Sequence, residues 1–105
     1  MSDEAPQAGT GVPAGAISKD LLIINKRGLH ARASAKFVQL VEKFSAEVWV
    51  TRGGETVGGT SIMGLMMLSA GPGSTITVSA IGPDAEAVVT AITELVESKF
   101  NEESL

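Results

Sequence analysis

One histidine is the residue of this sequence best suited to chemistry, and it lies between a glycine and an arginine. The segment reads Gly28-Leu29-His30-Ala31-Arg32, and His30 is the single histidine of the chain. An imidazole nitrogen is nucleophilic near neutral pH, so it can accept a phosphoryl group and later pass it on. Arg32 can reach the phosphoryl oxygens with two parallel N–H donors. The segment is therefore a candidate site in which a histidine accepts a phosphoryl group and an arginine assists.

His30 lies where a glycine turn ends and a helix is expected to begin. Asn25-Lys26-Arg27-Gly28 is a turn pattern, and the apolar residues that follow predict a helix from Ala31 to about Phe44. A helix N-terminus presents unpaired N–H groups and the positive end of the helix dipole, which stabilise an anion by up to about 1–2 kcal/mol. A phosphoryl group on His30 would be such an anion. By itself, however, the Gly-x-His-x-Arg pattern more often indicates a capping histidine beside a surface arginine, so the rest of the chain has to decide.

Length and composition narrow the classes of protein to which the chain can belong. With 105 residues, 44% of them hydrophobic, it can build one compact domain. Cysteine is absent and histidine is single, so we expect no disulfide and no metal. We also expect no cofactor. No apolar run approaches the ~20 residues of a membrane span, and the acidic N-terminus does not resemble a secretory signal. We therefore expect a cytoplasmic protein that does not contact a membrane.

The charge of the chain is negative overall but unevenly placed. The formal net charge of −4 argues against non-specific binding to nucleic acid. Seven of the eight basic residues fall between Lys19 and Arg52, whereas the end of the chain is acidic, with Glu97, Glu102 and Glu103. A locally basic region suits a phosphate or an acidic partner, and scattered solvated charges are the alternative.

The expected strands and helices follow a short tail. Residues 1–16 are rich in Gly, Ala and Pro, so we expect a flexible N-terminal tail and then one domain over residues 17–105. The order β-α-β-β-α-β-α fits a sheet that helices cover on one face only, with Trp49 on the open face. The expected strands are Leu21–Ile24, Ala46–Thr51, Glu55–Val57 and Ser74–Ile81, and the expected helices are Ala31–Phe44, Ile62–Leu68 and one opened by Gly82-Pro83-Asp84.

Two motifs, taken in this order, resemble those of a known protein family. The segment Asn25–Ala35, NKRGLHARASA, is followed about thirty residues later by Thr60–Leu68, TSIMGLMML, and then by Gly71-Pro72-Gly73. This combination resembles the HPr family, the phosphocarriers of the bacterial phosphoenolpyruvate-dependent phosphotransferase system. The resemblance covers about Ile17 to Phe100. It implies an α+β fold of the open-faced β-sandwich type, in which three helices cover one face of a four-stranded antiparallel sheet.

The resemblance also implies roles for individual residues. His30 matches the histidine that is phosphorylated on its δ1 nitrogen, and Arg32 matches the arginine that assists transfer. Ser61 matches a serine that opens the second helix and is a regulatory phosphorylation site in some members. Capping of that helix is an alternative reason for a serine there. Many members have proline directly after the arginine, where this chain has Ala33, so we expect an active but less rigid site.

The expected helix Ile62–Leu68 is more apolar than a helix with one buried face requires. By resemblance, Ile62, Met63 and Met66 should lie beside His30 and dock both partners, because methionine adapts to more than one protein surface. The implied partners are enzyme I as donor and an EIIA-type protein as acceptor, with an HPr kinase/phosphorylase for Ser61. A helix buried on all sides is the alternative. We expect a monomeric carrier that is not an enzyme.

Two other functions are open on the sequence. A regulatory protein-binding module of the same fold would act by contact alone, but it would not need both His30 and Arg32. An RNA-binding domain would use the sheet, yet the acidic balance and the lack of an aromatic platform argue against it. For a carrier, both sugar uptake and a nitrogen-related regulatory branch are open. The Met-rich helix and Ala33 slightly favour the regulatory branch or a combined role.

Overall fold

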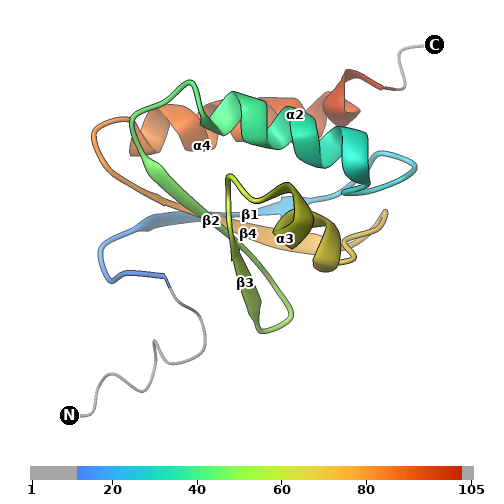
Figure 1. Cartoon of the computed structure of the whole chain (residues 1–105), viewed down its shortest axis with the longest axis horizontal. Helices are drawn as coiled ribbons and strands as arrows, with labels where there is room; N and C mark the ends of the chain where they lie inside the picture. The colour runs from blue at the N-terminus through green and yellow to red at the C-terminus, as the bar shows by residue number, and fades with distance from the viewer. Residues whose placement is uncertain (1–11, 103–105) are drawn as a thin grey trace.

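The computed structural model describes residues 12–102 and shows helices on one side of a sheet (Figure 1). The strands are β1 (Ile17–Leu22), β2 (Glu47–Arg52), β3 (Glu55–Gly58) and β4 (Thr75–Ile81), and the helices are α2 (Ala31–Val41), α3 (Ile62–Met67), α4 (Ala85–Glu97) and the short 3-10 helix η1 (Lys99–Asn101). No helix in this part of the chain is long and apolar enough to cross a membrane. Residues 1–11 of the expected tail and residues 103–105 of the expected domain lie outside the described residues.

The strands form one antiparallel sheet in the order β1-β4-β2-β3. Gly53 and Gly54 join β2 to β3, and their φ angles of 56° and 90° are the left-handed values that a two-residue hairpin turn requires. β4 lies between β1 and β2, so Val78 is paired with Lys19 on one side and with Val50 on the other. β4, the last strand in the sequence, therefore connects the first strand, β1, to the hairpin of β2 and β3.

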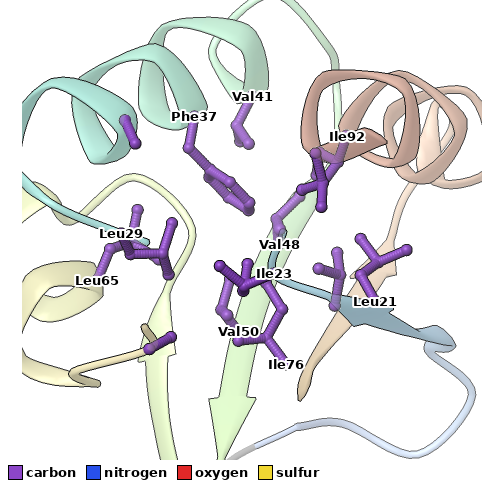
Figure 2. Close-up of a cluster of buried hydrophobic side chains, with 14 of the residues drawn as sticks. Leu21, Ile23, Leu29, Phe37, Val41, Val48, Val50, Leu65, Ile76 and Ile92 are labelled. Atoms are coloured by element: carbon purple, nitrogen blue, oxygen red, sulfur yellow. The ribbon is translucent and has the colours of Figure 1, made fainter. Parts of the chain in front are cut away.

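One face of the sheet and the inner sides of the helices form a hydrophobic core (Figure 2). Val50, Ile76 and Val78 face this core and are fully buried, because side chains alternate between the two faces of a strand. Phe37 of α2 and Ile92 of α4 pack onto them from the helical layer. α2 and α4 lie side by side over the sheet, and α3 packs against α2. The fold is the predicted α+β open-faced sandwich with three helices on one face.

The opposite face of the sheet has polar side chains. The hydroxyl of Thr77 on β4 donates a hydrogen bond to Asp20 on β1 at 2.7 Å. Trp49 lies between the buried residues Val48 and Val50 on β2, so its half-buried side chain is on this second face. This is the open face on which the sequence places the tryptophan.

The first strand is Ile17–Leu22, and the prediction of Leu21–Ile24 is wrong in its bounds. β1 is an edge strand, so all of its side chains except that of Leu21 are exposed, and three in a row, Ser18 to Asp20, are polar and interrupt the apolar pattern. Ile23 lies beyond the strand and bonds to the loop before β4. Its N–H donates to the Ser74 carbonyl, and its carbonyl accepts from the Gly73 N–H, both at 2.8 Å.

The first long helix ends at Val41, earlier than the predicted end at Phe44. The N–H groups of Lys43 and Phe44 each bond to the carbonyl three residues back, at 3.1 and 3.0 Å. The chain therefore tightens into turns after Val41. Phe44 still packs against the core, which explains why the apolar pattern extends past the helix.

Candidate functional site

His30 is the N-cap residue of α2, as expected from its place after the glycine turn. Its backbone is extended, with φ −74° and ψ −177°, and its carbonyl accepts the first hydrogen bond of the helix, from Ser34 at 2.9 Å. The Nδ1 atom accepts from the backbone N–H of Arg32 at 3.3 Å. Nδ1 therefore lies among the unpaired N–H groups of the helix N-terminus, where the helix dipole favours an anion.

The turn before His30 is held against the loop that follows α3. Gly28 has φ 63°, and a Cβ built on it would come within 2.1 Å of the Ala70 carbonyl oxygen. The N–H of Leu29 donates to that same carbonyl at 2.9 Å, and the Leu29 side chain is buried in the core. Only glycine fits at residue 28, because the backbone is left-handed and the space is filled. The contacts of Gly28 and Leu29 with Ala70 and the core therefore fix the backbone that leads into His30.

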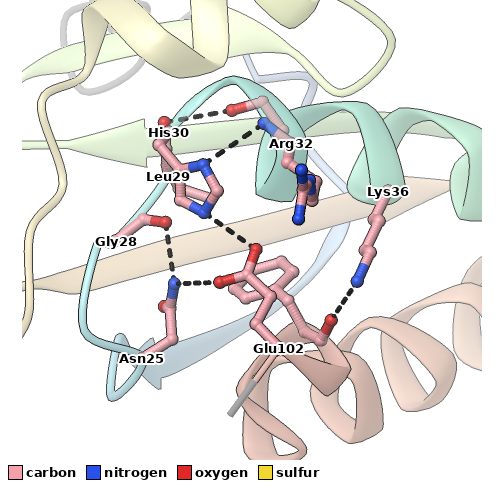
Figure 3. A network of polar contacts seen from close by, with 9 residues as sticks. Asn25, Gly28, Leu29, His30, Arg32, Lys36 and Glu102 are labelled. Carbon is pink, nitrogen blue, oxygen red and sulfur yellow. Dashed lines mark hydrogen bonds and ion pairs between the residues drawn. The ribbon is translucent and has the colours of Figure 1, made fainter.

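The other ring nitrogen of His30 contacts a carboxylate from the end of the described chain. Nε2 lies 2.8 Å from Oε2 of Glu102, with the two side chains 17% and 11% exposed (Figure 3). Glu102 Oε1 accepts from Nδ2 of Asn25 at 3.4 Å, and the same Nδ2 donates to the Gly28 carbonyl at 2.9 Å. A backbone N–H can only donate, so Nδ1 is the acceptor. We therefore assign the proton of the neutral ring to Nε2, which donates it to Glu102.

Arg32 lies in the first turn of α2, two residues after the cap. Its backbone N–H bonds to His30, and its side chain is exposed. Within residues 12–102 its guanidinium has no hydrogen bond or ion pair, so its donors are available to an anion bound at His30. Ala33, the residue after Arg32, is buried in the core.

The predicted docking residues lie on α3 beside the helix that His30 caps. Only Leu65 of this helix is buried, so the alternative of a helix buried on all sides is wrong. Ser61 caps the helix, because its Oγ accepts from the N–H of Gly64 at 2.9 Å. The exposed apolar side chains of α3 are Ile62, Met63, Met66 and Met67, which we call the α3 surface.

Comparison with known proteins identifies the family of this chain. The family model described as the PTS HPr component phosphorylation site matches residues 17–98. The chain belongs to the HPr family. The phosphocarrier protein HPr of Cupriavidus necator is 48% identical over 86 residues, which cover 82% of this chain and 97% of the relative. The phosphocarrier protein NPr of Shewanella violacea is 42% identical over 88 residues, covering 84% of this chain and 97% of the relative.

A solved structure gives the same answer for the fold. The crystal structure of HPr-C-His from Thermoanaerobacter tengcongensis is 44% identical and superposes with a TM-score of 0.79, covering 83% of this chain and 98% of that one. The resemblance seen in the two motifs and the predicted fold class are therefore confirmed. As a member of the HPr family, the chain is a phosphocarrier of the phosphotransferase system and not a catalyst.

Sequence reasoning missed two polar residues at His30. Asn25 reads as part of a turn, yet it is fully buried and bonded to Glu102. Glu102 belongs to an acidic end that the sequence shows, but the histidine lies 72 residues away along the chain. The capping position of His30 gives no information about a carboxylate so distant. Only the fold of the segment after α4 brings the two together.

Proposed function

We propose that this HPr-family protein accepts a phosphoryl group on Nδ1 of His30 from enzyme I and passes it to an EIIA-type protein. The observation that carries the proposal is the arrangement of the imidazole. Nδ1 has its lone pair at the N-terminus of α2, whereas Nε2 is held by Glu102. A nucleophile needs the unprotonated nitrogen, and Nδ1 is that atom.

The surroundings of Nδ1 suit the charge that it would receive. A phosphoryl group there would replace the hydrogen bond from the Arg32 N–H, and this N–H could then donate to a phosphoryl oxygen. The exposed guanidinium of Arg32 can contribute two further donors in a planar pair. Arg32 is therefore proposed to assist transfer by stabilising the equatorial phosphoryl oxygens in the transition state.

The α3 surface is proposed to dock both partners in turn. It consists of flexible or branched apolar side chains that are exposed to water, and α3 lies against α2. Methionine side chains adapt to surfaces of different shape, as a carrier with two partners requires. Ser61 begins this helix, so phosphorylation by an HPr kinase/phosphorylase would place charge at the edge of the surface.

The test is incubation with phosphoenolpyruvate and each candidate enzyme I, followed by mass measurement of the intact chain. We expect one added phosphoryl group that acid removes, and no such group on His30→Ala. The enzyme I that loads the chain fastest identifies the branch, sugar uptake or nitrogen-related regulation, in which the protein works. Acid-labile phosphate on the His30→Ala protein would disprove the assignment of the carrier residue.

A further inference from the structure

The chain after α4 folds back across the start of α2 and brings a carboxylate to His30. η1 contains three consecutive residues in the left-handed region, Lys99, Phe100 and Asn101, with φ between 57° and 59°. This backbone is unfavourable for residues that have a Cβ, so tertiary contacts must hold it. Phe100 is fully buried in the core, and its carbonyl accepts from Nζ of Lys36 at 2.6 Å. We call residues 98–102 the C-terminal strap.

The strap ends in a carboxylate whose two oxygens both have partners. Oε2 of Glu102 lies 2.8 Å from His30 Nε2, and Oε1 accepts from Asn25 Nδ2 at 3.4 Å (Figure 3). The Asn25 amide oxygen has no partner within residues 12–102, so the nitrogen alone sets the orientation of this buried amide. The same nitrogen also donates to the Gly28 carbonyl, which belongs to the turn before His30. The imidazole is therefore held at Nε2, on the side of the ring opposite Nδ1, by the Glu102 carboxylate.

We propose that Glu102 is a positioning residue for His30, oriented by Asn25. The proposal rests on the function proposed above, in which Nδ1 receives the phosphoryl group. Glu102 holds the proton of the ring on Nε2, which leaves the lone pair on Nδ1. A carboxylate that is 11% exposed is weakly screened by water, so it acts strongly on a charge in the ring.

The transfer step shows where the carboxylate acts. The Nδ1 lone pair forms the bond to phosphorus while the bond from phosphorus to the donor's leaving group breaks, and the leaving group keeps that electron pair. The ring becomes positive, and its proton stays on Nε2 beside Glu102. On delivery a nucleophilic group of the acceptor forms its bond to phosphorus as the P–N bond breaks. The electron pair of that bond returns to Nδ1, and the neutral ring keeps the proton. Glu102 therefore stabilises the charge that appears only as the bond forms.

The experiment compares Glu102→Gln with a matched control, Glu97→Gln. Glu97 is an exposed carboxylate at the end of α4, so both variants lose one negative charge. Single-turnover phosphorylation by enzyme I is measured over a range of enzyme I concentrations. We expect Glu102→Gln to lower the maximal rate about tenfold with an unchanged apparent KM, and Glu97→Gln to match wild type. Equal maximal rates for the Glu102 variant and wild type would overturn the proposal.

A second variant distinguishes two roles for Glu102: positioning the His30 ring, or only holding the C-terminal strap in place. Lys36→Met removes the hydrogen bond to Phe100 but touches neither ring nitrogen of His30. It should lower the thermal midpoint while keeping the maximal rate. A loss of rate as large as that of Glu102→Gln, with the proton of neutral His30 still held on Nε2 by Glu102, would mean that Glu102 only fastens the strap.

The protonation of the ring gives a readout that does not depend on transfer. Long-range ¹H–¹⁵N spectra of neutral His30 should show the proton on Nε2 in wild type and a shift toward the Nδ1-protonated form in Glu102→Ala. An unchanged tautomer in that variant would contradict the positioning role. If wild type accepted no phosphate from enzyme I, the proposed function would fail, whereas the tautomer measurement would still decide what Glu102 does.

Discussion

At the scale of single residues, the site divides the work between the two nitrogens of one imidazole. Nδ1 lies at the N-terminus of α2, and Nε2 is bonded to a carboxylate. Histidine is suited to this division because its two ring nitrogens have different roles in each tautomer. The residues around the ring therefore differ in role: Gly28 sets the path of the chain, and Arg32 is proposed to bind the phosphoryl group.

Replacement of Arg32 by alanine should slow phosphoryl transfer and leave the fold intact. The guanidinium has no partner within residues 12–102, so the free energy of unfolding should change by less than about 0.5 kcal/mol. Loss of a charged hydrogen bond in the transition state should slow transfer roughly 10- to 100-fold. Urea unfolding and single-turnover transfer measure the two effects, with Arg27→Ala as the exposed control. A large loss of stability at an unchanged rate would contradict the assigned role.

Replacement of Gly28 by alanine should destabilise the protein. A Cβ at this position would lie 2.1 Å from the Ala70 carbonyl oxygen in a left-handed backbone. Backbone strain and overpacking together should lower the free energy of unfolding by about 2–4 kcal/mol. Gly53→Ala is the matched control, since Gly53 has φ 56° and nothing within 4 Å of its added Cβ. Equal midpoints of the two variants in urea would show that the contact with Ala70 is unimportant.

At the scale of elements, α3 is a short helix with one buried residue and an apolar surface that is exposed to water. Leu65 anchors it to the core, and Arg52 donates to the carbonyl of Leu68 at 3.1 Å beyond its end. The remaining apolar side chains add nothing to the core. An apolar surface of this kind on a small protein is typical of a contact site for other proteins.

Replacement of Met63 by aspartate should weaken binding of both enzyme I and the acceptor. Met63 is 69% exposed, so the fold tolerates the change, but a buried charge at an interface costs binding free energy. Each Kd should rise about tenfold, as measured by calorimetry. Leu22→Asp is the control, because Leu22 is exposed at the end of β1. NMR shifts on adding enzyme I that avoid the α3 surface would exclude it as the dock.

Replacement of Ser61 by aspartate should keep or slightly raise thermal stability while slowing phosphorylation of His30. An acceptor at the cap is retained for the Gly64 N–H, and a negative charge at a helix N-terminus stabilises by about 0.3–1 kcal/mol. The same charge must be desolvated when the α3 surface binds enzyme I. Ser61→Ala, which loses the cap but adds no charge, should show the reverse: a lower midpoint at the wild-type rate. An unfolded Ser61→Asp protein, or one loaded at the wild-type rate, would remove the case for a charge switch.

At the scale of the whole molecule, the antiparallel sheet and its helical layer bring distant segments to one place. The elements of the sheet could be predicted because alternating and helical patterns are local. The placement of His30 and Arg32 at the start of a helix could be predicted because five consecutive residues contain them. The Glu102 contact could not, since it depends on a left-handed turn after α4 and on the burial of Phe100. The bounds of β1 were missed because an edge strand exposes polar residues on both sides.

The expected monomer is a further property of the whole molecule. If the α3 surface and His30 meet each partner in turn, as proposed, a stable dimer over that surface would block both contacts. Light scattering at the concentrations used for transfer should give the mass of one chain, 10.8 kDa. A dimer that excluded enzyme I from α3 would contradict this expectation.

The most direct test of the central claim is to identify the atom that carries the phosphoryl group. The chain, labelled with ¹⁵N in its histidine, is loaded by enzyme I and phosphoenolpyruvate, and the ¹⁵N–³¹P coupling is then measured. The geometry predicts a single phosphorus coupled to Nδ1 of His30, with the proton on Nε2 beside Glu102. Coupling to Nε2, or phosphate on a residue other than His30, would contradict the account.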